Sequence, residues 1–423
     1  MANSIQKDST STFIDNMSLP LHRWYRYSAG FSAEWVESMI NEYLAGGHYS
    51  KDAVTVMDPF AGSGTTLLVC DKMGISSIGY EGHPFVYKVA KAKLSWSTDT
   101  SLFIREAGEI LNCARQLKSR MYTYPDIVYK SYDRDNLKKI NDLRKALEIN
   151  KNDTDEYLLA WMNFISILRS ASHAGTATWQ YVLPNKTKAR VADAFEAFQK
   201  QTDIMCEDML FMQAHSQVSR ASLLFQDARE KSDVPDNSVD LIITSPPYAN
   251  NYDYADATRL ELSVLGEIKG WGDLQKKIRP NLVRSCSQMV SRERKDTYEF
   301  LKSPLLKPIY EEILDVCQQL DAEKELHGGK KNYHTMIALY FLDLARIWKN
   351  LRRVCRDGSL TCFVIGDSAP YGIYVPVDEW LGRLAIAAGF KEYWFEKTRD
   401  RNVKWKNRKH SVPLKEGRLW VRG

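Results

Sequence analysis

The chain has 423 residues, with 58 lysines and arginines against 53 aspartates and glutamates, so its formal net charge is +5. An apolar fraction of 44% and a charged fraction of 26% exclude a disordered, collagenous or coiled-coil chain. No stretch reaches the ~20 apolar residues of a transmembrane helix, and residues 1–15 lack the apolar core of a secretory signal. The seven cysteines show no paired spacing, so we expect reduced thiols in a cytoplasmic protein without a membrane partner.

The first part of the chain predicts alternating strands and helices. Residues 1–18 are polar, and we expect a flexible N-terminal lead. Ser32 is expected to cap a helix whose apolar positions begin at Trp35. The elements that follow are a strand at 53–57, a glycine-bearing turn, a helix at 65–73 ended by Gly74, a strand at 75–80 and a helix at 83–94. This order within roughly thirty residues predicts the βαβ unit of a doubly wound, mostly parallel sheet.

The rest of the chain predicts two insertions into this sheet. Residues 98–218 read as a large α-helical insertion, with helices at 135–148 and 157–170 and a turn rich in small residues at 172–176. A polar insertion spans about 269–331. The remaining elements are strands at 223–225, 239–244, 359–365, 393–397 and 418–421, a long helix at 336–354 stopped by Gly358, and a helix at 377–388. We therefore predict an α/β, Rossmann-like domain formed by 19–97 and 219–423.

The first chemical motif is the strand-to-helix turn Asp58-Pro59-Phe60-Ala61-Gly62-Ser63-Gly64-Thr65-Thr66. Its two glycines let the backbone bend sharply beside a ligand, and the N–H groups of the following helix point toward the turn. Leu67 stands where a dinucleotide fingerprint has its third glycine, and no Gly-Lys-Thr or Gly-Lys-Ser closes a Walker loop. The turn thus favours a nucleoside smaller than a pyrophosphate cofactor, and a tight turn without a ligand is the alternative.

Acidic residues follow two other predicted strands. Glu81 ends the second strand, where a carboxylate can accept hydrogen bonds from two ribose hydroxyls. A solvated carboxylate at the strand end is the alternative. Asp227, followed by Ala228, is suited to receive an adenine amino group, and a helix N-cap is the alternative there.

The strongest signal is Ser245-Pro246-Pro247-Tyr248, directly after the strand at 239–244. Two prolines remove N–H donors and stiffen the loop, so its carbonyl oxygens remain as acceptors. Ser245 adds a hydroxyl and Tyr248 a flat ring, which together suit an exocyclic amine on a stacked base. The alternative is a rigid loop that packs a tyrosine.

The segments 58–66 and 245–248 resemble the cofactor and catalytic motifs of the S-adenosylmethionine-dependent DNA amino-methyltransferases. The Ser-Pro-Pro-Tyr form is most typical of the cytosine-N4 branch. The resemblance implies methyl transfer from S-adenosyl-L-methionine to the amine of a base flipped out of double-stranded DNA. Ser245 and the Pro246 carbonyl would hold that amine, and Tyr248 would stack on the base.

The same resemblance implies a set of cofactor-binding residues. Phe60, Gly62 and Gly64 would surround the methionine and ribose, and Glu81 would hold the ribose hydroxyls. His83 and Pro84 would line the adenine, and Asp227 would bind its amine. The segment 25–32 resembles a cofactor lid. The full set is Tyr27, Phe31, Ser32, Asp58, Pro59, Phe60, Gly62, Gly64, Thr65, Thr66, Glu81, His83, Pro84, Asp227 and Ala228.

Three alternatives stay open: an adenine-N6 DNA methyltransferase, an RNA base amino-methyltransferase, and a cofactor-binding specificity subunit without activity. A carbon-5 cytosine mechanism is disfavoured because none of the seven cysteines follows a proline. We also expect restriction or other defence proteins as partners. The eight histidines have no metal-ligand spacing, so we predict no metal.

Two basic segments bear on the DNA partner. Ten lysines and arginines lie between 396 and 423, with Trp405 among them, which fits phosphate contact or a solvated hairpin. Eight lie between 269 and 295, in a loop that orders on DNA or a solvated insertion. We place target recognition in 98–218 together with 269–331.

Overall fold

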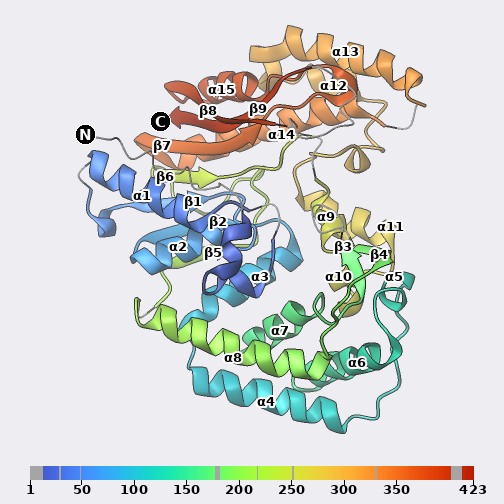
Figure 1. Cartoon of the computed structure of the whole chain (residues 1–423). Coiled ribbons are helices and arrows are strands. Elements are labelled where there is room, and N and C mark those ends of the chain that lie inside the picture. The colour runs from blue at the N-terminus through green and yellow to red at the C-terminus, as the bar shows by residue number, and fades with distance from the viewer. Residues whose placement is uncertain are drawn as a thin grey trace, which may run out of the picture.

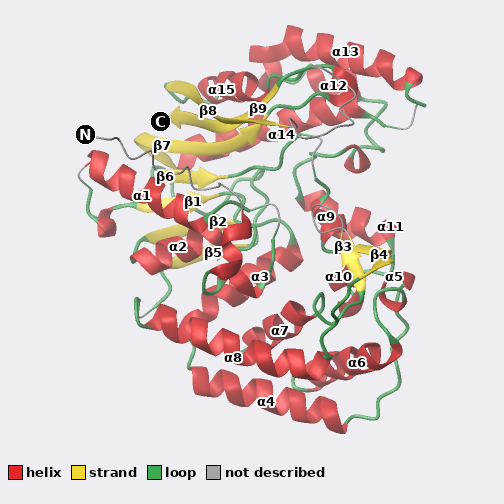
Figure 2. Cartoon of the chain, in the orientation of Figure 1, coloured by secondary structure: helices red, strands yellow, loops and turns green. Residues whose placement is uncertain are grey.

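The structure is a computed structural model that describes residues 13–27, 30–47, 49–176, 182–216, 218–249, 252–328, 331–401 and 412–423. Its main element is a seven-stranded sheet in the order β5-β2-β1-β6-β7-β9-β8, with helices on both faces (Figures 1 and 2). The strands are β1 Thr55–Asp58, β2 Ser76–Tyr80, β5 Ala221–Leu224, β6 Val239–Thr244, β7 Cys355–Gly366, β8 Glu392–Arg401 and β9 Leu414–Arg422. The first five strands in this order are parallel, and β9 is antiparallel to both neighbours. The predicted Rossmann-like fold is confirmed.

The central strands are apolar on both sides. In β1, Val56 faces a core shared with α1 (Ala33–Gly47) and α2 (Thr65–Met73). Met57, the next residue, faces the opposite core with α14 (Tyr333–Val354) and α15 (Val377–Ala387). Parallel strands covered by helices on both faces carry such continuous apolar runs, which explains the run of Leu241, Ile242 and Ile243 in β6.

The strand order changes direction at β1. This strand lies between β2 and β6, so the connection after β1 leads to β2 on one side and the connection after β6 leads to β7 on the other side. In a doubly wound sheet, ligands bind in the crevice at this switch point. Asp58 is the last residue of β1 and Thr244 the last of β6, so the turn at 59–64 and the loop at 245–248 begin at the same edge.

Most predicted elements are confirmed, and α2 and β6 have the predicted bounds. Two predictions are wrong. The long helix ends at Val354 as predicted, but Gly358 does not stop it, because this glycine lies in β7 with a φ of 80°. This glycine bends the strand, whose pairing passes from Cys355 opposite Val239 to Leu360 opposite Leu241. The segment predicted as a turn at 172–176 contains β3 (Ala174–Thr176), which pairs with β4 (Val182–Thr187). The prediction failed because three small residues show no alternation of polar and apolar side chains.

Among its described residues, the segment 98–218 contains five α-helices: α4 Thr100–Gln116, α5 Asp126–Tyr129, α6 Arg134–Ile149, α7 Asp155–Ile167 and α8 Ala194–Gln213. Two of them, α6 and α7, correspond to the predicted helices at 135–148 and 157–170. The core shared by the five helices also takes in side chains of α3 (Pro84–Leu94) and of residues 255–278. That later segment holds α9 (Tyr254–Ala257), α10 (Arg259–Leu265) and α11 (Trp271–Asp273). A buried ion pair, Arg169 Nε to Glu261 Oε1 at 2.5 Å, joins the end of α7 to α10. The division into two units stays a prediction.

The segment 269–331 is packed into the protein. It contains α12 (Thr297–Leu301) and α13 (Tyr310–Leu326), and Leu274, Val290 and Leu306 are buried. Two of its arginines form internal ion pairs: Arg279 with Asp253 at 2.6 Å, and Arg284 with Asp343. A simply solvated insertion is therefore excluded.

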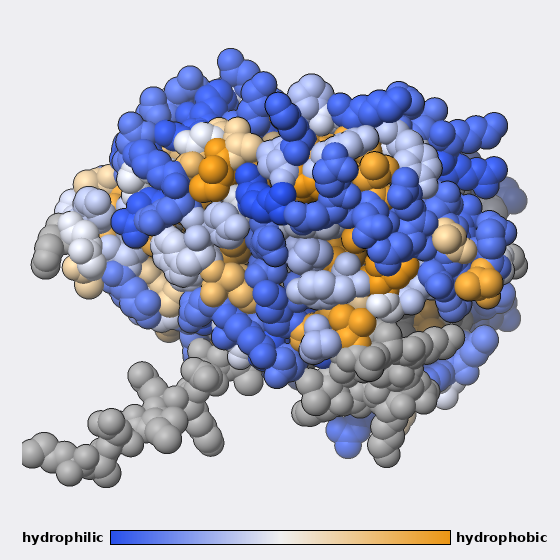
Figure 3. Space-filling model, turned by 90° about the horizontal axis from the view of Figure 1, so that it is seen from above, coloured by the Kyte–Doolittle hydropathy of each residue, from blue (hydrophilic) through white to orange (hydrophobic). Residues whose placement is uncertain are grey.

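One face of the molecule is seen in the space-filling view (Figure 3). Seen from above Figure 1, the molecule is largely hydrophilic, with hydrophobic side chains in small separate groups (Figure 3). Among the described residues, no helix is both long enough and apolar enough to cross a bilayer.

Candidate active site

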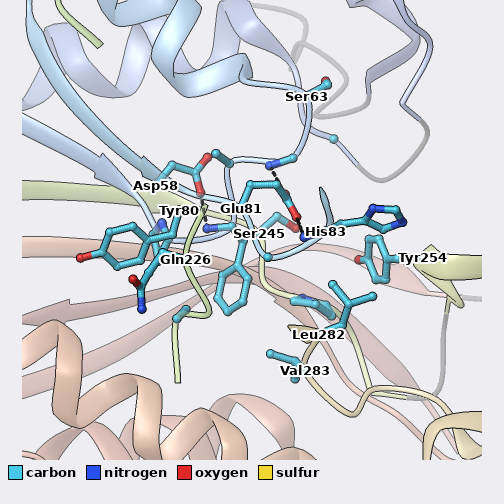
Figure 4. Close-up of a pocket in the computed structure, with 18 of the residues that line it drawn as sticks. Asp58, Ser63, Tyr80, Glu81, His83, Gln226, Ser245, Tyr254, Leu282 and Val283 are labelled. Atoms are coloured by element: carbon cyan, nitrogen blue, oxygen red, sulfur yellow. Dashed lines mark hydrogen bonds between the residues drawn. The ribbon is translucent and has the colours of Figure 1, made fainter. Parts of the chain in front are cut away.

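A pocket with an empty volume of about 790 Å³ lies at the carboxyl edge of the parallel strands (Figure 4). The predicted residues that line it are Tyr27, Phe31, Asp58, Pro59, Phe60, Gly62, Thr65, Glu81, His83, Asp227, Ala228, Ser245 and Pro247. The structure thus brings most of both predicted motifs to one cavity.

Six predicted residues are not part of the lining. They are Ser32, Gly64, Thr66, Pro84, Pro246 and Tyr248. Ser32 caps α1, where its hydroxyl accepts a hydrogen bond from Trp35 N at 3.4 Å. Gly64 precedes α2 with a φ of 88°, and Pro84 is the first residue of α3. These three residues shape the elements around the pocket.

Asp58 ties the glycine turn to β6. Its carboxylate accepts hydrogen bonds from Thr66 Oγ1 at 2.8 Å and Thr244 Oγ1 at 2.6 Å. A third bond comes from Phe60 N at 3.0 Å. Burial raises the pKa of Asp58 to about 6, although the hydrogen bonds from the two threonines and Phe60 act in the opposite direction. The carboxylate therefore holds the turn in place from within the protein.

Gly62 is required by the geometry of that turn. Its φ is 54°, a left-handed conformation that is unfavourable for residues other than glycine. A Cβ atom built here would lie 2.8 Å from Tyr27 Cε1. The glycine thus lets the Tyr27 ring lie against the backbone at the pocket wall.

Glu81 lies between the glycine turn and α3. Its Oε2 accepts a hydrogen bond from Gly62 N at 2.9 Å, and its Oε1 accepts one from His83 N at 2.7 Å. The side chain is buried, so the solvated alternative is wrong, and burial raises the pKa of Glu81 to about 8. Figure 4 shows Glu81 near the centre of the labelled residues. The ribose role stays a prediction.

His83 lines the pocket, and one of its ring nitrogens has no hydrogen-bond partner among the described residues. Its Nε2 is 3.0 Å from Thr258 Oγ1, whereas its buried Nδ1 has no hydrogen-bond partner within the described ranges. Burial lowers the pKa of His83 to about 3, so the imidazole is neutral. An unpartnered polar atom in a pocket wall is costly unless a ligand or water satisfies it.

Asp227 forms an ion pair with Arg229. The guanidinium contacts both carboxylate oxygens, with Nη2 to Oδ2 at 2.6 Å, and also donates to Pro280 O at 2.5 Å. Arg229 reaches Asp343 of α14 as well, at 3.3 Å. The helix N-cap alternative is wrong because residues 225–238 form turns and no helix begins there. The adenine role of Asp227 stays a prediction.

The Ser-Pro-Pro-Tyr loop leaves β6 toward the pocket. Ser245 Oγ donates to Val364 O at 3.3 Å, and Ser245 and Pro247 line the cavity. Pro246 is buried. Tyr248 is partly buried beside the pocket, and Arg401 Cζ lies 5.1 Å from its ring centroid. Burial and the nearby Glu416 carboxylate raise the pKa of Tyr248.

Ten lining residues are absent from the predicted set, although the first three lie within the predicted segments 25–32 and 58–66: Gly30, Ala61, Ser63, Tyr80, Gly82, Gln226, Tyr254, Asn281, Leu282 and Val283. Six of them neighbour predicted residues in the chain. The last four come from residues 254–283, and no sequence motif indicates that this segment approaches the pocket. Gly82 was one available signal, because a Cβ there would lie 2.4 Å from Asn281 O. Leu282 and Val283 form an apolar wall below the strand ends in Figure 4.

The basic segment at 396–423 is only partly described. Lys404, Trp405, Lys406, Arg408 and Lys409 lie outside the described residues. The described lysines and arginines each pair with an acid of this chain: Lys397, Arg399, Arg401, Lys415, Arg418 and Arg422. These six charges are thus partly neutralised within the protein. In the part of the chain that the structure covers, no group of three potential ligands could hold a metal.

A mostly parallel Rossmann-like sheet carries a pocket at its switch point, and Ser245 and Pro247 of the Ser-Pro-Pro-Tyr loop line that pocket. These features define the class as an α/β methyltransferase fold with a cofactor-type cavity.

Comparison with known proteins narrows this class. The N6/N4 family model described as DNA methylase matches residues 8–92, which include the glycine turn and Glu81. The Type II methyltransferase M.BsoBI of Geobacillus stearothermophilus is 25% identical over 420 residues, covering 89% of this chain and 80% of that protein. M.AvaI of Nostoc sp. is 25% identical over 417 residues, covering 90% and 81%. M.MjaII of Methanocaldococcus jannaschii is 38% identical over 74 residues, which are 18% of this chain and 13% of that protein. These similarities support a DNA amino-methyltransferase.

Proposed function

We propose that this protein is a site-specific DNA methyltransferase that transfers a methyl group from S-adenosyl-L-methionine to N4 of cytosine in a restriction–modification or related defence system. The observation that carries the proposal is that Ser245 and Pro247 line the same pocket as Asp58 and Glu81. Similarity to two Type II methyltransferases over most of the chain supports the DNA substrate.

The chemistry of the pocket fits this cofactor. Asp58, Glu81 and Asp227 supply acidic side chains whose oxygens can accept hydrogen bonds from ribose hydroxyls and amino groups. Glu81 would hold the ribose, and Asp227 would accept from the adenine amine. When bound, the cofactor supplies an activated methyl group on a positively charged sulfur.

The loop residues would act on the target amine. The amine lone pair is delocalised into the base ring, so the amine is a weak nucleophile. Because the Ser245 hydroxyl donates to Val364 O, its oxygen lone pairs remain as acceptors, and the Pro246 carbonyl is a second acceptor. Hydrogen bonds from the amine to these oxygens return electron density to nitrogen. Polarisation and positioning are then the contributions of the protein, with Tyr248 stacked on the flipped base.

The choice of cytosine rests on Ser245. Serine before Pro-Pro-Tyr is typical of the cytosine-N4 branch that the sequence resembles. Adenine N6 is the competing target, and the product analysis below separates the two.

The test is transfer of a labelled methyl group from S-adenosyl-L-methionine to genomic DNA and, in parallel, to total RNA. The labelled nucleosides are then identified by mass. We expect N4-methylcytosine in DNA. N6-methyladenine would correct the base, label in RNA alone would change the substrate, and cofactor binding without any transfer would favour a specificity subunit.

A pair of serine variants tests the loop itself. Ser245→Ala should lower transfer strongly, whereas Ser238→Ala should not, because Ser238 precedes the opposite end of β6 and its hydroxyl bonds Pro235 O. Equal activity in both variants would remove Ser245 from the mechanism.

A further inference from the structure

We infer that Arg401 is a positioning residue that backs one face of the Tyr248 ring, so that the opposite face is presented to the target base. This inference rests on the proposed function and adds a residue from the last part of the chain to it. Arg401 is the last residue of β8, far from Tyr248 in sequence.

The contact between the two residues has the geometry of a cation–π interaction. Arg401 Cζ lies 5.1 Å from the centroid of the Tyr248 ring, within the ~6 Å over which such pairs attract. The Arg401 side chain is only 13% exposed, so water screens this attraction weakly. A base that stacks on Tyr248 must therefore use the ring face that Arg401 does not cover.

Arg401 is itself fixed at the carboxyl edge of the sheet. Its Nη1 donates to Asp367 O at 2.5 Å, and its Nε lies 3.7 Å from Glu416 Oε2. Glu416 is 7% exposed, and it pairs with Gly366 in the β7–β9 register. The guanidinium is thus held by the end of β7 and by β9.

Gly366 makes this arrangement possible. A Cβ built on Gly366 would lie 2.8 Å from Arg401 Cδ and 2.9 Å from its Nη1. The arginine side chain therefore crosses directly over the end of β7, one residue before the carbonyl that it bonds.

A fixed arginine supports stacking in a way that lysine does not. The guanidinium is planar and makes hydrogen bonds while it lies on a ring, whereas an ammonium is a mobile point charge. With Arg401 in place, the tyrosine ring has its orientation before the base arrives, which lowers the cost of ordering it during the reaction.

The test compares two arginines on one strand that share the partner Glu416. Arg399 also binds this carboxylate, with Nη2 to Oε1 at 2.6 Å, and its side chain is 50% exposed. Arg401→Met should lower the single-turnover rate of methyl transfer about tenfold while the Kd for S-adenosyl-L-methionine stays unchanged. Arg399→Met should change the rate less than about twofold. Arg401→Lys should restore only part of the rate.

Two further readouts separate positioning from structural support. Mapping methylation by the wild-type protein identifies the target base, which is then replaced by 2-aminopurine in a duplex. Arg401→Met should lower the fluorescence gain that reports the unstacked base. In a Tyr248→Ala background, Arg401→Met should cause no additional loss of rate, because its effect passes through the ring.

The outcomes are distinct from those of the proposed function. A wild-type protein that transfers no methyl to DNA overturns the proposed function and this inference together. An active wild type with a normal Arg401→Met variant overturns the inference alone. So does an Arg401→Met variant that slows the Tyr248→Ala protein as much as it slows the wild type.

Discussion

Glu81 accepts a hydrogen bond from the backbone of Gly62 at 2.9 Å, so the end of β2 fixes the turn that follows β1. The same carboxylate accepts a second hydrogen bond from His83 N at 2.7 Å, at the start of α3. One buried acidic side chain therefore connects three segments of the pocket wall, and its protonation state affects each of them.

The binding of S-adenosyl-L-methionine should depend on pH through Glu81. Burial raises the pKa of this carboxyl from 4.5 to about 8, and its charged form is the stronger acceptor for hydroxyl donors. Affinity measured by calorimetry should therefore rise with pH up to about 8. Glu81→Gln should remove this rise and weaken binding by about 2 kcal/mol. A pH dependence that persists in Glu81→Gln would assign it to another group.

The same shift has a consequence for stability. Because the folded-state pKa lies above the ordinary value, the charged form is disfavoured in the folded protein. The contribution of Glu81 to the free energy of unfolding should be largest below pH 4.5 and fall as pH rises to about 8. Urea titrations of Glu81→Gln should lack this component and keep the one from Asp58, whose pKa is about 6.

Gly62→Ala should damage the pocket more than the fold. The new methyl would meet Tyr27 Cε1 at 2.8 Å, at a positive φ that costs about 1–2 kcal/mol for alanine. We expect weaker cofactor binding in calorimetry. The control is Gly108→Ala in α4, where a Cβ meets nothing within 4 Å. That variant should gain up to about 1 kcal/mol of stability. Equal cofactor affinity in both proteins would contradict the role of the turn.

Arg229→Met should destabilise the protein and weaken cofactor binding. It leaves Asp227 without its guanidinium and removes one of two arginines from the fully buried Asp343. Breaking a buried ion pair costs about 3 kcal/mol. Arg220→Met removes an exposed pair with Asp52 and should cost less than about 1 kcal/mol. Similar denaturation midpoints for the two variants would argue against a stabilising role of the ion pairs that Arg229 forms with Asp227 and Asp343.

Lys93→Met should stabilise the protein. The Lys93 side chain is fully buried, its Nζ donates to His22 O at 3.2 Å, and burial lowers its pKa from 10.5 to about 7. Wild-type stability should therefore fall as pH drops from 10.5 to about 7, and the variant should lose this slope. Methionine leaves the His22 carbonyl without its hydrogen bond, at a cost of about 1–3 kcal/mol. We expect this cost to be smaller than the gain from no longer burying a lysine. A less stable variant at neutral pH would contradict this balance.

Local patterns were enough to predict much of the fold and the pocket. Apolar runs with turn residues at their ends gave β1, α2 and β6, and their order along the chain predicted the edge where Asp58 and Ser245 meet. What the sequence did not reveal depends on long-range packing. Nothing near Leu282 or Arg401 shows which distant strand end it approaches, and the small residues at 174–176 carry no strand periodicity.

The core shared by α4–α8 and residues 255–278 also constrains the order in which the protein acquires its structure. During synthesis the helices of 98–218 leave the ribosome before Glu261, so the ion pair between Arg169 and Glu261 forms only after β6 and the Ser-Pro-Pro-Tyr loop have also emerged. The helical segment therefore completes its packing only as the loop that would hold the target amine is delivered. We expect nascent chains that end before residue 255 to expose apolar surface and to depend on chaperones, in contrast to chains that extend past 278.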